Sequence, residues 1–169
     1  MREYVTDAVV LAREPAGERD SLVTLWTEHF GKLAAKAKSA RKITSKLSAH
    51  LEPGTILSVR LVERRTNGLI IADALRRGRA RANTSDLAKL ERILAEHEPN
   101  DNLWLLLATA DFSWPEALRI LGWDPMLATC DACGQPKPTC FHLARQIYSC
   151  TNCQSLWQMS QNELIYIDE

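Results

Sequence analysis

The chain lacks the features that direct a protein into a membrane or an export pathway. Its longest uninterrupted apolar run, residues 103–108, is far shorter than the ~18 residues that a membrane-spanning helix needs. The apolar stretch 9–12 follows the charged pair Arg2-Glu3 and is too short for a signal peptide. We therefore expect a cytoplasmic protein with no membrane partner.

The sequence also lacks the motifs of common catalytic and nucleotide-binding sites. It contains neither a GxxxxGK[ST] phosphate loop nor a GxGxxG turn. Its four histidines are scattered along the chain, at His29, His50, His97 and His142. No nucleophile can be paired with a base. Apolar residues make up 46% of the 169 residues and charged residues 25%, which are ordinary globular values. These absences predict a folded accessory protein rather than an enzyme.

The formal net charge of zero conceals an asymmetry between the two halves. Residues 1–82 carry 16 Lys and Arg against 9 Asp and Glu, a balance of +7, and residues 83–169 carry 5 against 12, a balance of −7. A basic half joined to an acidic half suggests two parts with different partners, although surface composition alone can also produce it.

The first half alternates apolar and polar residues with the period of a β-strand. Strands are expected at residues 4–11, 21–26, from 31 onwards, 56–62 and 69–75, with Pro53-Gly54 and Asn67-Gly68 as turn signals. Five short strands, with a longer connection over 42–52, predict an oligonucleotide/oligosaccharide-binding (OB-type) β-barrel at residues 1–82. An SH3-like barrel fits the pattern nearly as well.

The third expected strand carries a row of lysines. Leu33, Ala35 and Ala37 alternate with cations that share the other face, where neighbours lie roughly 7 Å apart. No acidic residue interrupts the run, which makes these six residues the candidates for contacting nucleic-acid phosphates: Lys32, Lys36, Lys38, Arg41, Lys42 and Lys46. The alternative is a solvated edge strand, because lysine also protects sheet edges from aggregation.

Two further features of this half have two readings each. The arginines Arg76, Arg77, Arg79 and Arg81 extend the same path or form a solvated linker. Trp26, His29 and Phe30 could stack on exposed bases, but packing in the core is the commoner role of an aromatic residue.

The second half has helical periodicity. Asn83-Thr84-Ser85-Asp86 is a helix-start signal with several good cap residues, and Pro99-Asn100 ends that helix. Asp101 begins a second helix, and Trp114-Pro115 begins a third that ends at Gly122. We predict an α+β protein in which the barrel is followed by a small helical domain at 83–169. No site is assigned to its leucine and tryptophan faces.

All five cysteines lie between residues 130 and 153. Cys130-x-x-Cys133 and Cys150-x-x-Cys153 are separated by sixteen residues, the spacing of a four-cysteine zinc site. Gly134 suits the tight turn of such a knuckle. Four thiolates leave no open coordination position, so one structural Zn²⁺ is expected within residues 128–155. Cys140 is left over, as a buried small residue or a free thiol, and His142 is a less favoured substitute ligand.

Two stretches of the sequence resemble the RecO family of bacterial recombinational repair proteins. The first is Ala8-Val9-Val10-Leu11, then Gly17-Glu18-Arg19-Asp20-Ser21-Leu22-Val23-Thr24-Leu25-Trp26-Thr27 and Gly31-Lys32. The second runs from Leu118-Arg119-Ile120-Leu121-Gly122-Trp123-Asp124-Pro125 to Cys130-Asp131-Ala132-Cys133-Gly134, with Phe141 before Cys150 and Cys153.

The resemblance implies an N-terminal OB barrel, a helical domain with an embedded zinc site, and no catalytic activity. It further implies binding of single- and double-stranded DNA, strand annealing, and action with RecR to load RecA onto DNA coated by single-strand-binding protein, at the nucleoid. The chain departs from the family at Ser39, where members often have glycine, and after Cys153, where glycine is missing. It also ends at Glu169, soon after the zinc site, which puts binding of the single-strand-binding protein's tail in question.

Two other classes of function share these bulk features. An RNA-binding barrel with a zinc ribbon would have the same composition, and competition between single-stranded DNA and structured RNA would distinguish it. A protein-interaction scaffold would be indifferent to nucleic acid at low salt.

Overall fold

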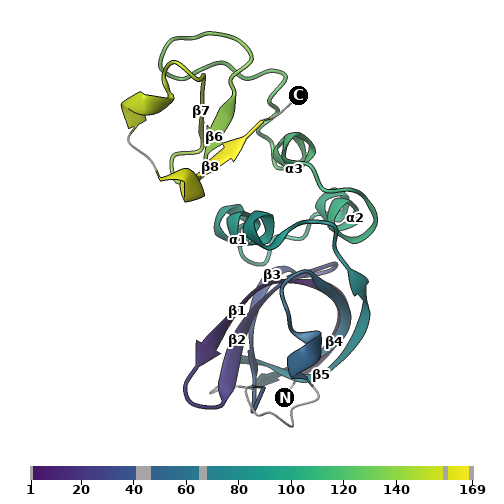
Figure 1. Ribbon diagram of the computed structural model, residues 1–169. Coiled ribbons are helices and arrows are strands. Elements are labelled where there is room, and N and C mark those ends of the chain that lie inside the picture. The colour runs from purple at the N-terminus through teal and green to yellow at the C-terminus, as the bar shows by residue number, and fades with distance from the viewer. Residues whose placement is uncertain (1, 41–46, 65–67, 158–159, 168–169) are drawn as a thin grey trace. The chain divides into compact units, whose positions relative to one another are not determined.

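The computed structural model describes the chain except for residues 1, 41–46, 65–67, 158–159 and 168–169. It forms two compact units, Met1–Asp111 and Phe112–Glu169 (Figure 1). The barrel itself ends near the expected boundary at Ala82, but the first two helices belong to the same compact unit as the barrel. Whether residues 1–82 act as a separate nucleic-acid-binding domain stays a prediction.

Five strands of the first unit close into a barrel in the order β1-β2-β3-β5-β4, as Figure 1 shows. They are β1 Arg2–Ala16, β2 Asp20–Thr27, β3 Gly31–Ala37, β4 Thr55–Arg64 and β5 Gly68–Arg79. Neighbouring strands are antiparallel except β3 and β5, which meet in parallel at Lys36 and Ile70. This closed five-stranded ring is OB-like, so the structure decides between the two barrels that the sequence allowed.

The long strand β1 pairs with two neighbours along its length. Its first half pairs with β4, and its second half pairs with β2. The β1–β2 register shifts between Val10 and Ala12, and an extra residue of this kind bends a strand and increases its twist. The bend lets one strand serve both sides of the ring.

The alternating pattern puts one face of each strand inside the barrel. Residues from all five strands form one buried cluster, in which Val23, Leu25 and Leu57 are fully inaccessible. The short 3₁₀ turn η1, Ser48–His50, precedes Leu51, which joins the same cluster. Period-2 burial therefore confirms the strand predictions.

Two helices complete the first unit. They are α1, Thr84–Ile93, and α2, Asp101–Thr109, and the side chains of Asn83 and Asn100 cap them by accepting hydrogen bonds from the N–H groups of Asp86 and Leu103. Helix α1 packs against β1 and buries Leu87 and Leu90. The helix starts predicted at Asn83-Thr84-Ser85-Asp86 and at Asp101 are confirmed, whereas Asn100, expected only to end the first helix, caps the second.

The second unit holds the short helix α3, Trp114–Ile120, followed by a small sheet. The sheet has the order β7-β6-β8, from Ile147–Ser149, Cys140–His142 and Leu164–Tyr166. Two more 3₁₀ turns, η2 Gln154–Trp157 and η3 Gln161–Glu163, lie between β7 and β8. The ring of Phe141 lies 5.4 Å from that of Trp123 and 5.0 Å from that of Tyr148, so an aromatic core supports this sheet. Among the described helices, none has the length and apolar character needed to cross a membrane.

Candidate metal centre and nucleic-acid interface

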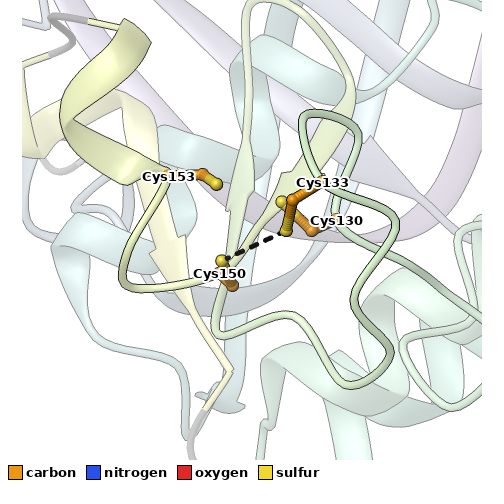
Figure 2. A group of neighbouring side chains, drawn as sticks. All are labelled: Cys130, Cys133, Cys150 and Cys153. Carbon is orange, nitrogen blue, oxygen red and sulfur yellow. Dashed lines mark hydrogen bonds between the residues drawn. The ribbon is translucent and has the colours of Figure 1, made fainter.

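The structure brings together the four cysteines that the sequence selected. The Sγ atoms of Cys130, Cys133, Cys150 and Cys153 all lie within 4.8 Å of one another, and those of Cys133 and Cys150 are 3.8 Å apart (Figure 2). A Zn–S distance of about 2.3 Å in a regular tetrahedron requires sulfurs about 3.8 Å apart. The residues present therefore fit a tetrahedral four-thiolate metal site.

The backbone around the first knuckle favours a thiolate. Burial opposes ionisation of the Cys130 thiol most strongly, but hydrogen bonds from the N–H groups of Cys150, Cys133 and Ala132 together lower its pKa to about 6. Gly134, at a φ of 71°, turns the chain back so that its N–H donates to the Cys130 carbonyl at 2.8 Å. This geometry allows several N–H groups to point at one sulfur.

The neighbouring thiols oppose ionisation of Cys153. Hydrogen bonds to Cys133 and Cys150 raise the pKa of the Cys153 thiol to about 12. Four thiolates so close together repel each other unless a cation lies between them. A bound cation would offset this repulsion and favour the deprotonated form of the donor set.

Cys140 and His142 are not part of this group. Both are fully buried on β6, where the hydroxyl of Ser149 lies 2.9 Å from the Cys140 sulfur and 2.8 Å from Nε2 of His142. Burial lowers the pKa of His142 and raises the pKa of the Cys140 thiol. Of the two readings of Cys140, the structure supports the buried small residue, and His142 belongs to the packing of the β6–β7 pair.

The lysine row of β3 has the orientation that its alternation predicts. Leu33, Ala35 and Ala37 are buried, while Lys32 and Lys36 are half-buried. Lys38, which was expected on the strand, lies in the turn directly after β3 and is exposed. The other three candidates, Arg41, Lys42 and Lys46, lie outside the described residues. That the six basic residues contact nucleic acid stays a prediction.

Lys32 is held by the last turn of α1 and by the segment that follows it. Its ammonium donates to the Glu91 carbonyl at 2.9 Å, and its own carbonyl accepts a hydrogen bond from the His97 N–H at 3.1 Å. Residues 32 and 96 also form a parallel bridge. We call this contact between residues 31–32 and 96–98 the β3 latch. The latch covers the start of the lysine row with the chain's own backbone.

Lys36 is paired with Asp20, the first residue of β2. Their charged groups are 3.1 Å apart, and the other Asp20 oxygen accepts the N–H of Ser39 at 2.8 Å. These contacts, first the Ser39 N–H and then the Lys36 side chain, hold the pKa of Asp20 below its usual value. Sequence reasoning missed both Asp20 and Glu91 as partners, because the pairs are separated by 16 and 59 positions. The only signal in the sequence was an acid at the start of the strand that pairs with the lysine strand.

The arginines and aromatics of the first half now have locations. Arg76, Arg77 and Arg79 are exposed on β5, and Arg81 pairs with Asp111 at 2.7 Å. Trp26 is buried at 1% exposure and Phe30 packs edge-on against Tyr4, whereas His29 is exposed. Packing is therefore the observed role of Trp26 and Phe30.

Comparisons with known proteins agree with these features. Residues 1–75 match the family model described as "Recombination protein O N terminal". The chain is 29% identical over 185 aligned positions to the DNA repair protein RecO of Thermodesulfovibrio yellowstonii, covering 95% of this chain and 74% of that protein. The family match covers the barrel, and the longer alignment also includes the cysteine cluster.

Proposed function

The chain belongs to the RecO family of DNA repair proteins, and from this we propose that its barrel binds single- and double-stranded DNA. It brings complementary strands together and promotes their annealing. With a RecR-like partner it helps to load RecA onto DNA coated by single-strand-binding protein. The protein acts in the cytoplasm, at the nucleoid, as a mediator without a catalytic step.

The outward face of β3 is the observation that supports DNA binding. Lys36 lies near the end of β3 and the exposed Lys38 follows directly after it, and the same barrel carries exposed arginines on β5. Cations in such a row neutralise phosphates on two strands and reduce the repulsion that opposes pairing. Because phosphate contacts carry no sequence information, binding is expected to be largely independent of sequence.

The four-cysteine cluster is proposed to hold one structural Zn²⁺ through Cys130, Cys133, Cys150 and Cys153. When bound, the ion joins the loop before β6 to the loop after β7 and neutralises charge among the four sulfurs. Since the four sulfurs fill a tetrahedron, no position remains for a substrate or a reactive water. The metal therefore stabilises the second unit, and the DNA contacts lie elsewhere.

Binding of a labelled single-stranded oligonucleotide across a salt series tests the proposal. We expect micromolar or tighter binding at low salt that weakens steeply as salt increases, on protein that carries one zinc per chain. Lys38→Gln should lower the slope of log K against log salt by about 0.7, the contribution of one phosphate contact on a single strand. Lys137→Gln removes the same charge from the second unit and should leave the slope unchanged.

Three outcomes would contradict the proposal in different ways. No binding at low salt by folded, zinc-loaded protein would remove the role of the barrel and favour a protein-interaction scaffold. Preferential binding of structured RNA in competition would favour an RNA accessory factor. Equal effects of Lys38→Gln and Lys137→Gln would show that β3 is not the contacting strand.

A further inference from the structure

Two side chains from the β1–β2 hairpin form hydrogen bonds with the chain just after the end of β3. The last β2–β3 pair joins Ser21 and Ala37, and Ser39 then reverses the chain with a φ of 54°. Beyond that pair, Asp20 accepts the N–H of Ser39, and the guanidinium of Arg13 donates to the carbonyl of Ala40 at 3.2 Å. The exposed Lys38 therefore lies between the last strand pair, at Ala37, and these two contacts, at Ser39 and Ala40, which set its path.

Arg13 also holds the far end of the same connection. Its two terminal nitrogens donate to the carbonyl of Ser48 at 3.1 Å and to the hydroxyl of Ser48 at 3.2 Å. Nε donates to Ser21 at 3.3 Å, and a further N–H donates to Glu52 at 2.8 Å. One side chain thus ties Ala40 and Ser48 to the hairpin, although they are separated from Arg13 by 27 and 35 positions.

The hydrogen-bonding capacity of Arg13 is used up by these contacts. A guanidinium has five N–H groups, and the five hydrogen bonds from Arg13 match that number. Its side chain is only 15% exposed. A phosphate could bind it only by displacing protein acceptors, so Arg13 differs from the exposed lysine that it flanks.

We propose that Arg13 is a positioning residue for DNA binding: it fixes the course of the chain after β3 and so the direction in which Lys38 is presented. The proposal rests on the DNA-binding function proposed above. Lysine cannot replace arginine here, because an ammonium has three donors on one atom and cannot span acceptors arranged around a planar fork. The role therefore depends on the shape of the side chain and not on its charge.

The test compares Arg13→Lys and Arg13→Met with the wild-type chain in binding of labelled oligothymidine across a salt series. If Arg13 positions Lys38, both variants should lower the slope of log K against log salt by about 0.7 or more, although Arg13→Lys keeps the charge. The effect of Lys38→Gln should also shrink when it is combined with Arg13→Lys. Arg60→Lys is the matched control on the outer face of β4, and it should bind as the wild type does.

The opposing results are distinct. An unchanged slope in Arg13→Lys with a decrease of about 0.7 in Arg13→Met would make Arg13 a direct phosphate contact and overturn the proposal. A lower unfolding midpoint with unchanged slope and full additivity with Lys38→Gln would reduce Arg13 to a structural role. Failure of the wild-type chain to bind would instead contradict the proposed function. If Arg13→Lys does not fold, Ser48→Ala takes its place, because it removes one acceptor and keeps the guanidinium. The same two measurements then apply to it: the salt slope of DNA binding and the additivity with Lys38→Gln.

Discussion

Substitution of Gly31 by alanine should destabilise the first unit by disturbing the β3 latch. Gly31 has a φ of 67°, and a Cβ there would lie 2.5–2.6 Å from the backbone of Glu98. A side chain in the left-handed region costs about 1–2 kcal/mol. Backbone that must move to admit a methyl group adds about 1–3 kcal/mol. The sum of about 2–5 kcal/mol is partly offset by about 0.4–1 kcal/mol from the stiffer unfolded chain, so we expect Gly31→Ala to lower the free energy of unfolding by about 2–4 kcal/mol.

Gly17 provides the matched control, because its φ is 81° but a Cβ there would meet nothing within 4 Å. Gly17→Ala carries the conformational cost without the clash, partly offset by about 0.4–1 kcal/mol from the stiffer unfolded chain, so a loss of about 1 kcal/mol is expected. The two variants should therefore differ by about 1–3 kcal/mol in free energy of unfolding, which is the cost of the contact between the new methyl group and the Glu98 backbone.

Urea denaturation followed by tryptophan fluorescence gives both free energies of unfolding, and hydrogen exchange reports the latch itself. In Gly31→Ala the amide of His97 should exchange faster, because its hydrogen bond to the Lys32 carbonyl is lost when Glu98 moves. Equal destabilisation of the two variants within ~0.5 kcal/mol, with unchanged exchange at His97, would refute the reasoning.

Three further predictions concern the turn after β3, the metal centre and acid stability. Ser39→Gly should raise the free energy of unfolding by about 0.5–1 kcal/mol in a urea titration, because glycine adopts the φ of 54° without steric cost. Cys150→Ser should release zinc at lower chelator concentrations and expose the second unit to protease, whereas Cys140→Ala should retain one zinc per chain. Because the pKa of Asp20 is lowered in the folded state, its contribution to stability is present above the ordinary value of 3.8 and is lost as pH falls through the lower folded value. The stability difference between the wild type and Asp20→Asn should therefore be constant from neutral pH to about pH 5 and shrink in more acid solution, and a difference that persists there would contradict the assignment.

Local patterns in the sequence determined the elements and the metal ligands. Alternation along β3 predicted both its buried face and its lysine face, since successive side chains of a strand point in opposite directions. The cap residues beginning at Asn83 marked the start of α1, because a cap acts on N–H groups only three residues away. The spacing of the two Cys-x-x-Cys pairs predicted that their four sulfurs lie together, because a four-cysteine metal site restricts this spacing.

The short strands around the metal centre left no such signal. Cys140–His142 and Ile147–Ser149 are each three residues long, which is too short for a periodicity to appear. The third strand, β8, follows two 3₁₀ turns and is therefore separated from β7 in the sequence. The partners of the lysine row were also invisible. Lys36 meets Asp20, and Lys32 meets the Glu91 carbonyl in α1, only because the barrel strands and the helix pack together.

What the sequence by itself determined are the properties that act over a few residues: strand and helix identity, caps, turns and the cysteine set. Only the tertiary structure decided which barrel these strands form, because ring order depends on pairings such as that of Lys36 with Ile70. It also decided that Arg13 serves as an anchor, since its acceptors come from four separate places in the chain. The sequence identifies a charged side chain that requires hydrogen-bond partners. Which groups become its partners is decided by packing between segments that are distant along the chain.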